Sequence, residues 1–128
     1  MQNLPFVITA TFTAEPAGGP LSLMLEELNF RPSIAFAPFN QVFQQLLDPA
    51  SMLASNRNGV NVVLVRLEDW AGHDSTFSEA ARGAIERNVA DLIAALESEV
   101  RNAGVPVIVA VGPLSLAAVA DSSFAGFC

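Results

Sequence analysis

The sequence predicts an α/β fold in which helices cover both faces of a parallel sheet, forming a three-layer α/β/α sandwich. Four short runs rich in β-branched and aromatic residues alternate with segments of helical periodicity. Each intervening segment is long enough to cross over the sheet and to return the chain in the same direction. Because such crossovers are right-handed, the helices are expected on both faces of the sheet.

The expected strands are short and apolar, and they cover Phe6–Phe12, Ser33–Ala37, Val60–Leu67 and Val105–Val111. The third run carries the strongest signal, because Val62 to Val65 is continuously apolar, as in a central strand covered on both faces. In the fourth run Pro106 lies near the start, where a strand tolerates proline.

The segments between these runs carry helix signals. Pro20 suits the first position of a helix, and it is followed at helical spacing by Leu21, Met24, Leu25 and Leu28. Asn40 is placed to cap a second helix that ends at Pro49, with an expected buried face of Val42, Phe43, Leu46 and Leu47. Residues 50–59 predict a loop or a single short turn.

A long third helix follows the third strand and ends near Gly104. Asp74 or Thr76 is placed to cap it, and its expected apolar stripe consists of Phe77, Ala81, Ile85, Val89, Leu92, Leu96 and Val100. This order of elements predicts a flavodoxin-like or SGNH-hydrolase-like sandwich. Residues 1–128 form one expected domain. The tail, 113–128, shows no periodicity, and an open four-stranded sheet leaves an apolar edge. We therefore expect the chain to lack its last strand or strands and to be a piece of a longer protein.

Composition excludes several classes of function. The chain has no lysine, six single arginines and a formal charge of −7. No basic stripe exists to neutralise phosphates, which argues against nucleic acid and anionic membranes as partners. No apolar run approaches the roughly 20 residues that span a bilayer. With Cys128 as the one cysteine and His73 as the one histidine, the chain has neither a disulfide nor a metal cluster. These features, and an N-terminus without a basic signal region, indicate a cytoplasmic protein without a metal.

Candidate site residues lie where the expected strands end, because ligands bind at the carboxyl ends of parallel strands. Three segments meet there, and they contribute Thr11 and Thr13, then Asn40 and Gln41, then Arg66, Glu68 and Asp69. The fourth strand adds Gly112, Pro113 and Ser115. In a functional interpretation Arg66 holds an anion and the carboxylates act as base or orienting groups. In a structural interpretation Arg66 pairs with a carboxylate, Asp69 caps a turn, and Asn40 and Gln41 begin a helix.

Neighbouring residues have structural interpretations too: Trp70 as a lid on the core, and His73 as a solvated loop residue. Nucleotide signatures are absent, since the chain has neither G-x-G-x-x-G nor a P-loop lysine. The nucleophile elbow G-x-S-x-G is absent as well. We therefore expect no cofactor.

The segment SIAFAPFNQVFQQLLDPASMLASNRNGVNVVLVRLEDW, with the opening FVITATFTAEP, resembles the N-terminal domain of the FkbH-like family. The resemblance extends from about Phe6 to Leu116 and is strongest to versions embedded in peptide and polyketide synthetases. It implies an SGNH-hydrolase-like fold and a role in secondary metabolism beside other synthetase domains and a carrier protein. In that family a phosphatase-like domain follows and a glyceryl unit is loaded onto the carrier. No D-x-D motif of that second domain is present here.

Mapped onto the SGNH pattern, the catalytic blocks of the family are altered. The Gly-Asp-Ser nucleophile block aligns with Ala10-Thr11-Phe12-Thr13, which has no serine. The Gly-x-Asn-Asp block aligns with Arg66-Leu67-Glu68-Asp69, where Glu68 replaces the oxyanion-hole asparagine and would repel a developing oxyanion. The block that carries the catalytic Asp and His has no counterpart.

Two hypotheses follow. The chain is a non-catalytic or substrate-positioning module of a synthetase, or it is a diverged acyl or glyceryl transferase or hydrolase. The second would use Thr11 or Thr13 with Glu68 and Asp69, while Asn40, Gln41 and Arg66 bind the substrate. A third interpretation, a flavodoxin-like receiver or FMN binder, fits the order of elements but lacks an acidic phosphorylation cluster and a phosphate loop.

Overall fold

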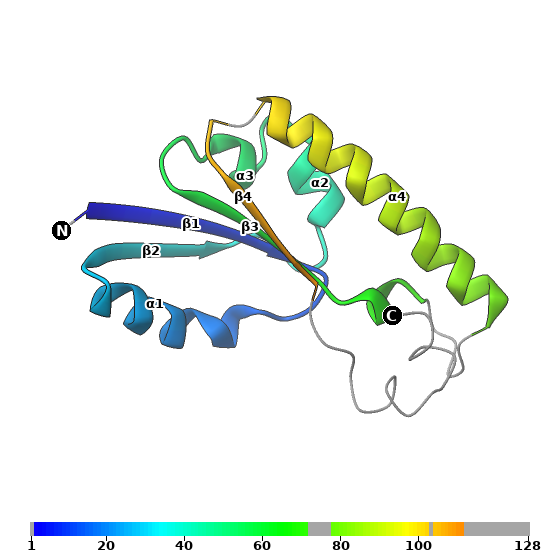
Figure 1. The fold of residues 1–128 in the computed structure, drawn as a ribbon, viewed down its shortest axis with the longest axis horizontal. Coiled ribbons are helices and arrows are strands. Elements are labelled where there is room, and N and C mark those ends of the chain that lie inside the picture. Colours follow the sequence, from blue (N-terminus) through cyan, green and yellow to red (C-terminus); the bar gives the residue numbers. More distant parts are fainter. Residues whose placement is uncertain (1, 72–77, 103, 112–128) are drawn as a thin grey trace.

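The sheet has four parallel strands in the order β2-β1-β3-β4, and Figure 1 shows its helices on both sides. The computed structural model describes residues 2–71, 78–102 and 104–111. The central strand β1 (Gln2–Ala10) pairs with β2 (Phe30–Phe36) and with β3 (Val60–Val65). The last strand, β4 (Val107–Val111), pairs with β3. The predicted α/β fold with a parallel sheet is confirmed.

Strand boundaries differ from the prediction because pairing, and not local hydrophobicity, sets them. The register joins Gln2 to Phe30, so β1 and β2 both begin earlier than their apolar runs. Pro32 therefore lies inside β2, which is an edge strand and tolerates a residue without an N–H. At the other end β3 stops at Val65, because residues 67–70 form the 3₁₀ helix η2 (Leu67–Trp70).

One face of the sheet is covered by three helices, α2 (Val42–Leu47), α3 (Met52–Ser55) and α4 (Glu79–Asn102). Their shared core consists of Val7, Val42, Leu46, Leu53, Val63, Val65, Leu92 and Ala95. Val63 and Val65 are completely buried, as the continuous apolar run of β3 predicts. This face therefore holds the larger core. That core fixes the position of α2, and it fixes η2 beyond the carboxyl end of β3.

The opposite face is covered by α1 (Gly18–Glu27), which follows the 3₁₀ helix η1 (Glu15–Ala17). The core on this side consists of Phe6, Ile8 and Leu25, with Leu21 packed against it. Helix α1 begins two residues before Pro20. Met24 and Leu28, which share the helical spacing of Leu21 and Leu25, are 62% and 66% exposed. Of the four residues at this spacing, Leu21 and Leu25 are the ones that pack against the core over β1 and β2.

The second helix also departs from the prediction. Asn40 does not cap it: Asn40 has a φ of 56°, in the left-handed region, and α2 begins at Val42. Gln45 is buried instead of Phe43 or Leu47, and its Oε1 accepts a hydrogen bond from the backbone N–H of Leu53 (3.3 Å). A buried amide therefore joins α2 to the short helix α3, which lies within the segment predicted as a loop or single turn.

The apolar stripe of α4 is confirmed at Ala81, Ile85 and Leu92 but ends differently. Val100 is 67% exposed and Glu99 is 4% exposed. Glu99 meets Asn61, the first inward residue of β3, whose Nδ2 donates to Glu99 Oε1 (3.2 Å) and to Leu53 O (2.9 Å). Burial raises the pKa of Glu99, and the hydrogen bond from Asn61 opposes that shift.

The outer edge of β4 is exposed and apolar. Ile108, Val109 and Val111 are 40–58% exposed, and no other strand of the described residues pairs with this edge. Further strands beyond it remain a prediction. The residues proposed for the cap of α4, Asp74 and Thr76, and the tail after Val111 lie outside the described residues. Among the helices of the described ranges, none is both long and apolar enough to cross a bilayer.

Replacing Glu99 by Gln tests the cost of burying this carboxyl. The folded state raises its pKa, so folded protein binds the proton more tightly than unfolded protein, and stability falls as pH rises from the unfolded pKa through the folded one. Glu99→Gln keeps the acceptor for Asn61 and removes the charge. We expect the substitution to increase the free energy of unfolding by about 1 kcal/mol at pH 8 and to leave it nearly unchanged at pH 4. Urea unfolding at the two pH values measures both effects. Glu97→Gln, on the exposed side of the same helix, is the control, and equal pH profiles for Glu99→Gln and the parent protein would contradict the assignment.

Candidate functional site

The candidate residues after β1 and β3 lie at the point where the order of strands reverses. From β1 the chain first adds β2 on one side and then β3 on the other. Open parallel sheets place their ligand crevice at this point, outside the carboxyl ends of the strands. Thr11 directly follows β1 and extends its ladder, because its N–H donates to Leu64 O (3.1 Å). Arg66 directly follows β3.

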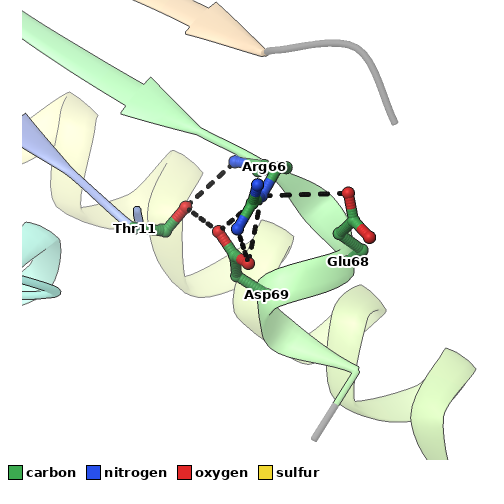
Figure 2. A network of polar contacts seen from close by, with 4 residues as sticks. All are labelled: Thr11, Arg66, Glu68 and Asp69. Carbon is green, nitrogen blue, oxygen red and sulfur yellow. Dashed lines mark hydrogen bonds and ion pairs between the residues drawn. The ribbon is translucent and has the colours of Figure 1, made fainter. Parts of the chain in front are cut away.

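Four side chains form a polar cluster here, which we call the rim network: Thr11, Arg66, Glu68 and Asp69 (Figure 2). The Thr11 hydroxyl donates to Asp69 Oδ2 (2.8 Å) and accepts from the backbone N–H of Arg66 (3.0 Å). The guanidinium of Arg66 forks onto Asp69, with Nη2 2.9 Å and Nε 3.1 Å from Oδ1. The network thus ties the end of β1 to the end of β3 and to η2.

Arg66 is neutralised within this network. Glu68 Oε1 lies 3.8 Å from Arg66 Nε, so one cation faces two carboxylates. The guanidinium carbon also lies 5.3 Å from the centre of the Phe12 ring, within cation–π range. The hydrogen bond to Asp69 raises the pKa of Arg66. The anion-holding role predicted for Arg66 therefore requires a ligand to compete with two carboxylates of the protein.

Thr11 is 3% exposed, and its hydroxyl is engaged on both its donor and its acceptor side. A nucleophile needs a lone pair aimed at an open space beside it. In this conformation a substrate carbon does not reach the Thr11 oxygen. Thr13 is exposed in the loop before η1, and it makes no hydrogen bond to another described residue. The geometry favours a positioning role for Thr11.

A groove of about 610 Å³ opens between α2, α4 and η2. We call it the rim groove, and it is lined by Asn40, Phe43, Gln44, Leu47, Asp48, Trp70 and Asn88. Phe43 and Trp70 stack, with ring centroids 5.8 Å apart. Asn40 is fixed at the carboxyl end of β1, because its N–H donates to Ala10 O (3.2 Å).

The structure thus brings together four of the seven predicted site residues in the rim network. Asn40 belongs to the rim groove, while Gln41 accepts a hydrogen bond from Gln45 (3.4 Å) and does not line the groove. His73 and the rim residues Gly112, Pro113 and Ser115 lie outside the described residues. Within the described ranges, no three His, Cys, Asp or Glu residues gather as a metal site would require.

Sequence reasoning missed three of the seven residues that line the groove, namely Gln44, Asp48 and Asn88, and it assigned Phe43, Leu47 and Trp70 to the core alone. A signal was present, because Asn40, Gln44 and Asp48 are polar residues at a spacing of four. That spacing puts side chains near one another on one side of a helix. The apolar residues of the same segment give the stronger pattern and mask this one.

Comparison with known proteins gives no relative. The chain matches no protein-family model, and it has no match among curated proteins or solved structures. The resemblance to the FkbH-like family therefore stays a prediction from the quoted segments.

Removal of the Thr11 hydroxyl is expected to destabilise the protein. Thr11→Val keeps the shape of the side chain but leaves the partly buried N–H of Arg66 without its acceptor, a loss of about 1 kcal/mol or more. Thr11→Ser, which keeps the hydroxyl, should retain most of the stability. Urea unfolding followed by circular dichroism measures both variants. A Val variant as stable as the parent protein would contradict a stabilising role of the Thr11 hydrogen bonds.

Proposed function

We propose that this chain is a non-catalytic, substrate-positioning module with an SGNH-hydrolase-like fold in a peptide or polyketide synthetase. It holds a carrier-bound group in the rim groove instead of reacting with it. The single observation that carries the proposal is the placement of Thr11. The residue at the position of the family's nucleophile is buried and doubly hydrogen-bonded. It does not line the rim groove, whose walls include Trp70 and Phe43.

The strand order supports the SGNH-like or flavodoxin-like part of the proposal. Order 2-1-3-4 is that of the first four strands of the doubly wound flavodoxin-like sheet. The exposed apolar edge of β4 agrees with a sheet that continues beyond this strand. Both features agree with the resemblance of the quoted segments to the FkbH-like family.

The rim network and the rim groove are mechanically connected through η2. Asp69 and Trp70 are neighbours in this four-residue 3₁₀ helix, and Asp69 is held by Thr11 and Arg66. The hydrogen bonds of Asp69 therefore fix the place of the indole that forms one wall of the groove. In this proposal the residues that would catalyse in a hydrolase instead hold the binding surface rigid.

The second candidate function is a diverged transferase or hydrolase, and one distance favours it. Thr11 Oγ1 lies 2.8 Å from Asp69 Oδ2, within the reach of a general base. For catalysis η2 would have to move so that Thr11 loses the Arg66 N–H and faces the groove. Glu68 would still place a carboxylate where a developing oxyanion needs a donor.

Intact-protein mass spectrometry separates the two candidates. The protein is incubated with an aminoacyl- or glyceryl-loaded carrier protein, and the masses of both proteins are followed. We expect no transfer, no hydrolysis above the rate of carrier alone and no adduct on this chain. A covalent adduct or carrier unloading that disappears in Thr11→Ala would establish the enzyme and overturn the proposal. Thr13→Ala is the matched variant for the exposed threonine.

A further inference from the structure

The lining of the rim groove contains one charged residue, and that residue is negative. Asp48 is the single ionisable side chain among the seven that line it. Asn40, Gln44 and Asn88 contribute amide groups, and Phe43, Leu47 and Trp70 contribute apolar surface. No lysine or arginine lines the groove, so an anionic ligand would meet no compensating charge there.

The carboxylate of Asp48 is held in place with one oxygen open. Its Oδ1 accepts the N–H of Ala50 (2.8 Å), and Oδ2 makes no hydrogen bond to the described residues. Asp48 also borders a smaller groove that Arg57 helps to line, but no ion pair joins the two within the described part of the chain. The charge of Asp48 is therefore available to a ligand in the rim groove.

The surroundings strengthen the preference for a cation. The rim network next to Trp70 holds one cation and two carboxylates, and the whole chain carries −7. Trp70 and Phe43 stack on each other, and the ring faces that the stack leaves uncovered attract positive charge through their quadrupoles. An ammonium group has three N–H donors, and the carbonyl oxygens of Asn40 and Gln44 add acceptors to the carboxylate.

From this chemistry we infer that the rim groove binds a primary ammonium group carried on a short apolar chain, with Asp48 as its counter-ion. This inference rests on the proposed positioning function and names the chemical class of the group that is held. Phe43, Leu47 and Trp70 cover the apolar chain, while Asp48 and the neighbouring amides take the ammonium.

Trp70 makes the test direct, because the chain has one tryptophan and no tyrosine. Its fluorescence is titrated at pH 7 with three probes of one length, hexylamine, hexanol and hexanoate. We expect hexylammonium to bind about five-fold more tightly than hexanol, as one ion pair and one cation–π contact at a partly exposed site provide. Hexanoate should bind more weakly than hexanol.

Asp48→Asn is the decisive variant, because it keeps the Oδ1 acceptor for Ala50 and removes the charge. The preference for hexylamine over hexanol should disappear in it. Glu26→Gln, which makes the same change of net charge on the exposed side of α1, should keep the preference. Phe43→Leu should weaken the binding of all three probes.

The outcomes separate the inference from the function on which it rests. Equal binding of amine and alcohol, or a preference that survives Asp48→Asn, overturns the ammonium assignment and leaves a binding module. Failure of all three probes to change Trp70 fluorescence counts against the groove as a binding site and hence against both proposals.

Discussion

The backbone N–H of Arg66 is the first donor beyond the end of β3, where no neighbouring strand offers it a carbonyl. The hydroxyl of Thr11 accepts this hydrogen bond and donates its own O–H to the carboxylate of Asp69. A side-chain oxygen thus replaces a strand carbonyl, and the chain can leave the sheet and turn at once into η2. The positions of Asp69, Trp70 and the groove wall all depend on that replacement.

At the carboxyl ends of the strands, the candidate site residues also hold the backbone in place. The polar side chains at this place satisfy a backbone group and one another. Thr11 closes a ladder, Asp69 holds a guanidinium, and Arg66 lies over Phe12. A cluster of polar residues at a switch point therefore identifies the place of a site more securely than it identifies a reaction.

The sequence was informative where one physical signal dominated. The continuous apolar run of β3 predicted a central strand, and parallel pairing then required Thr11, Arg66 and Asp69 to meet at the carboxyl ends. Prediction failed where a tertiary partner overrode local preference. Glu99 is buried because Asn61 lies opposite it, and Asn40 adopts a left-handed conformation while its N–H bonds to the end of β1. Neither partner is visible in a local pattern.

The strand order also has a consequence for biosynthesis. β1 lies between β2 and β3 in the sheet although it precedes both of them in the chain, and its second neighbour, β3, begins at Val60. During synthesis both edges of β1 are therefore paired only after some fifty further residues have been added, which takes several seconds at ordinary elongation rates of roughly 5–20 residues per second. During that interval β2 and α1 alone shield Phe6 and Ile8.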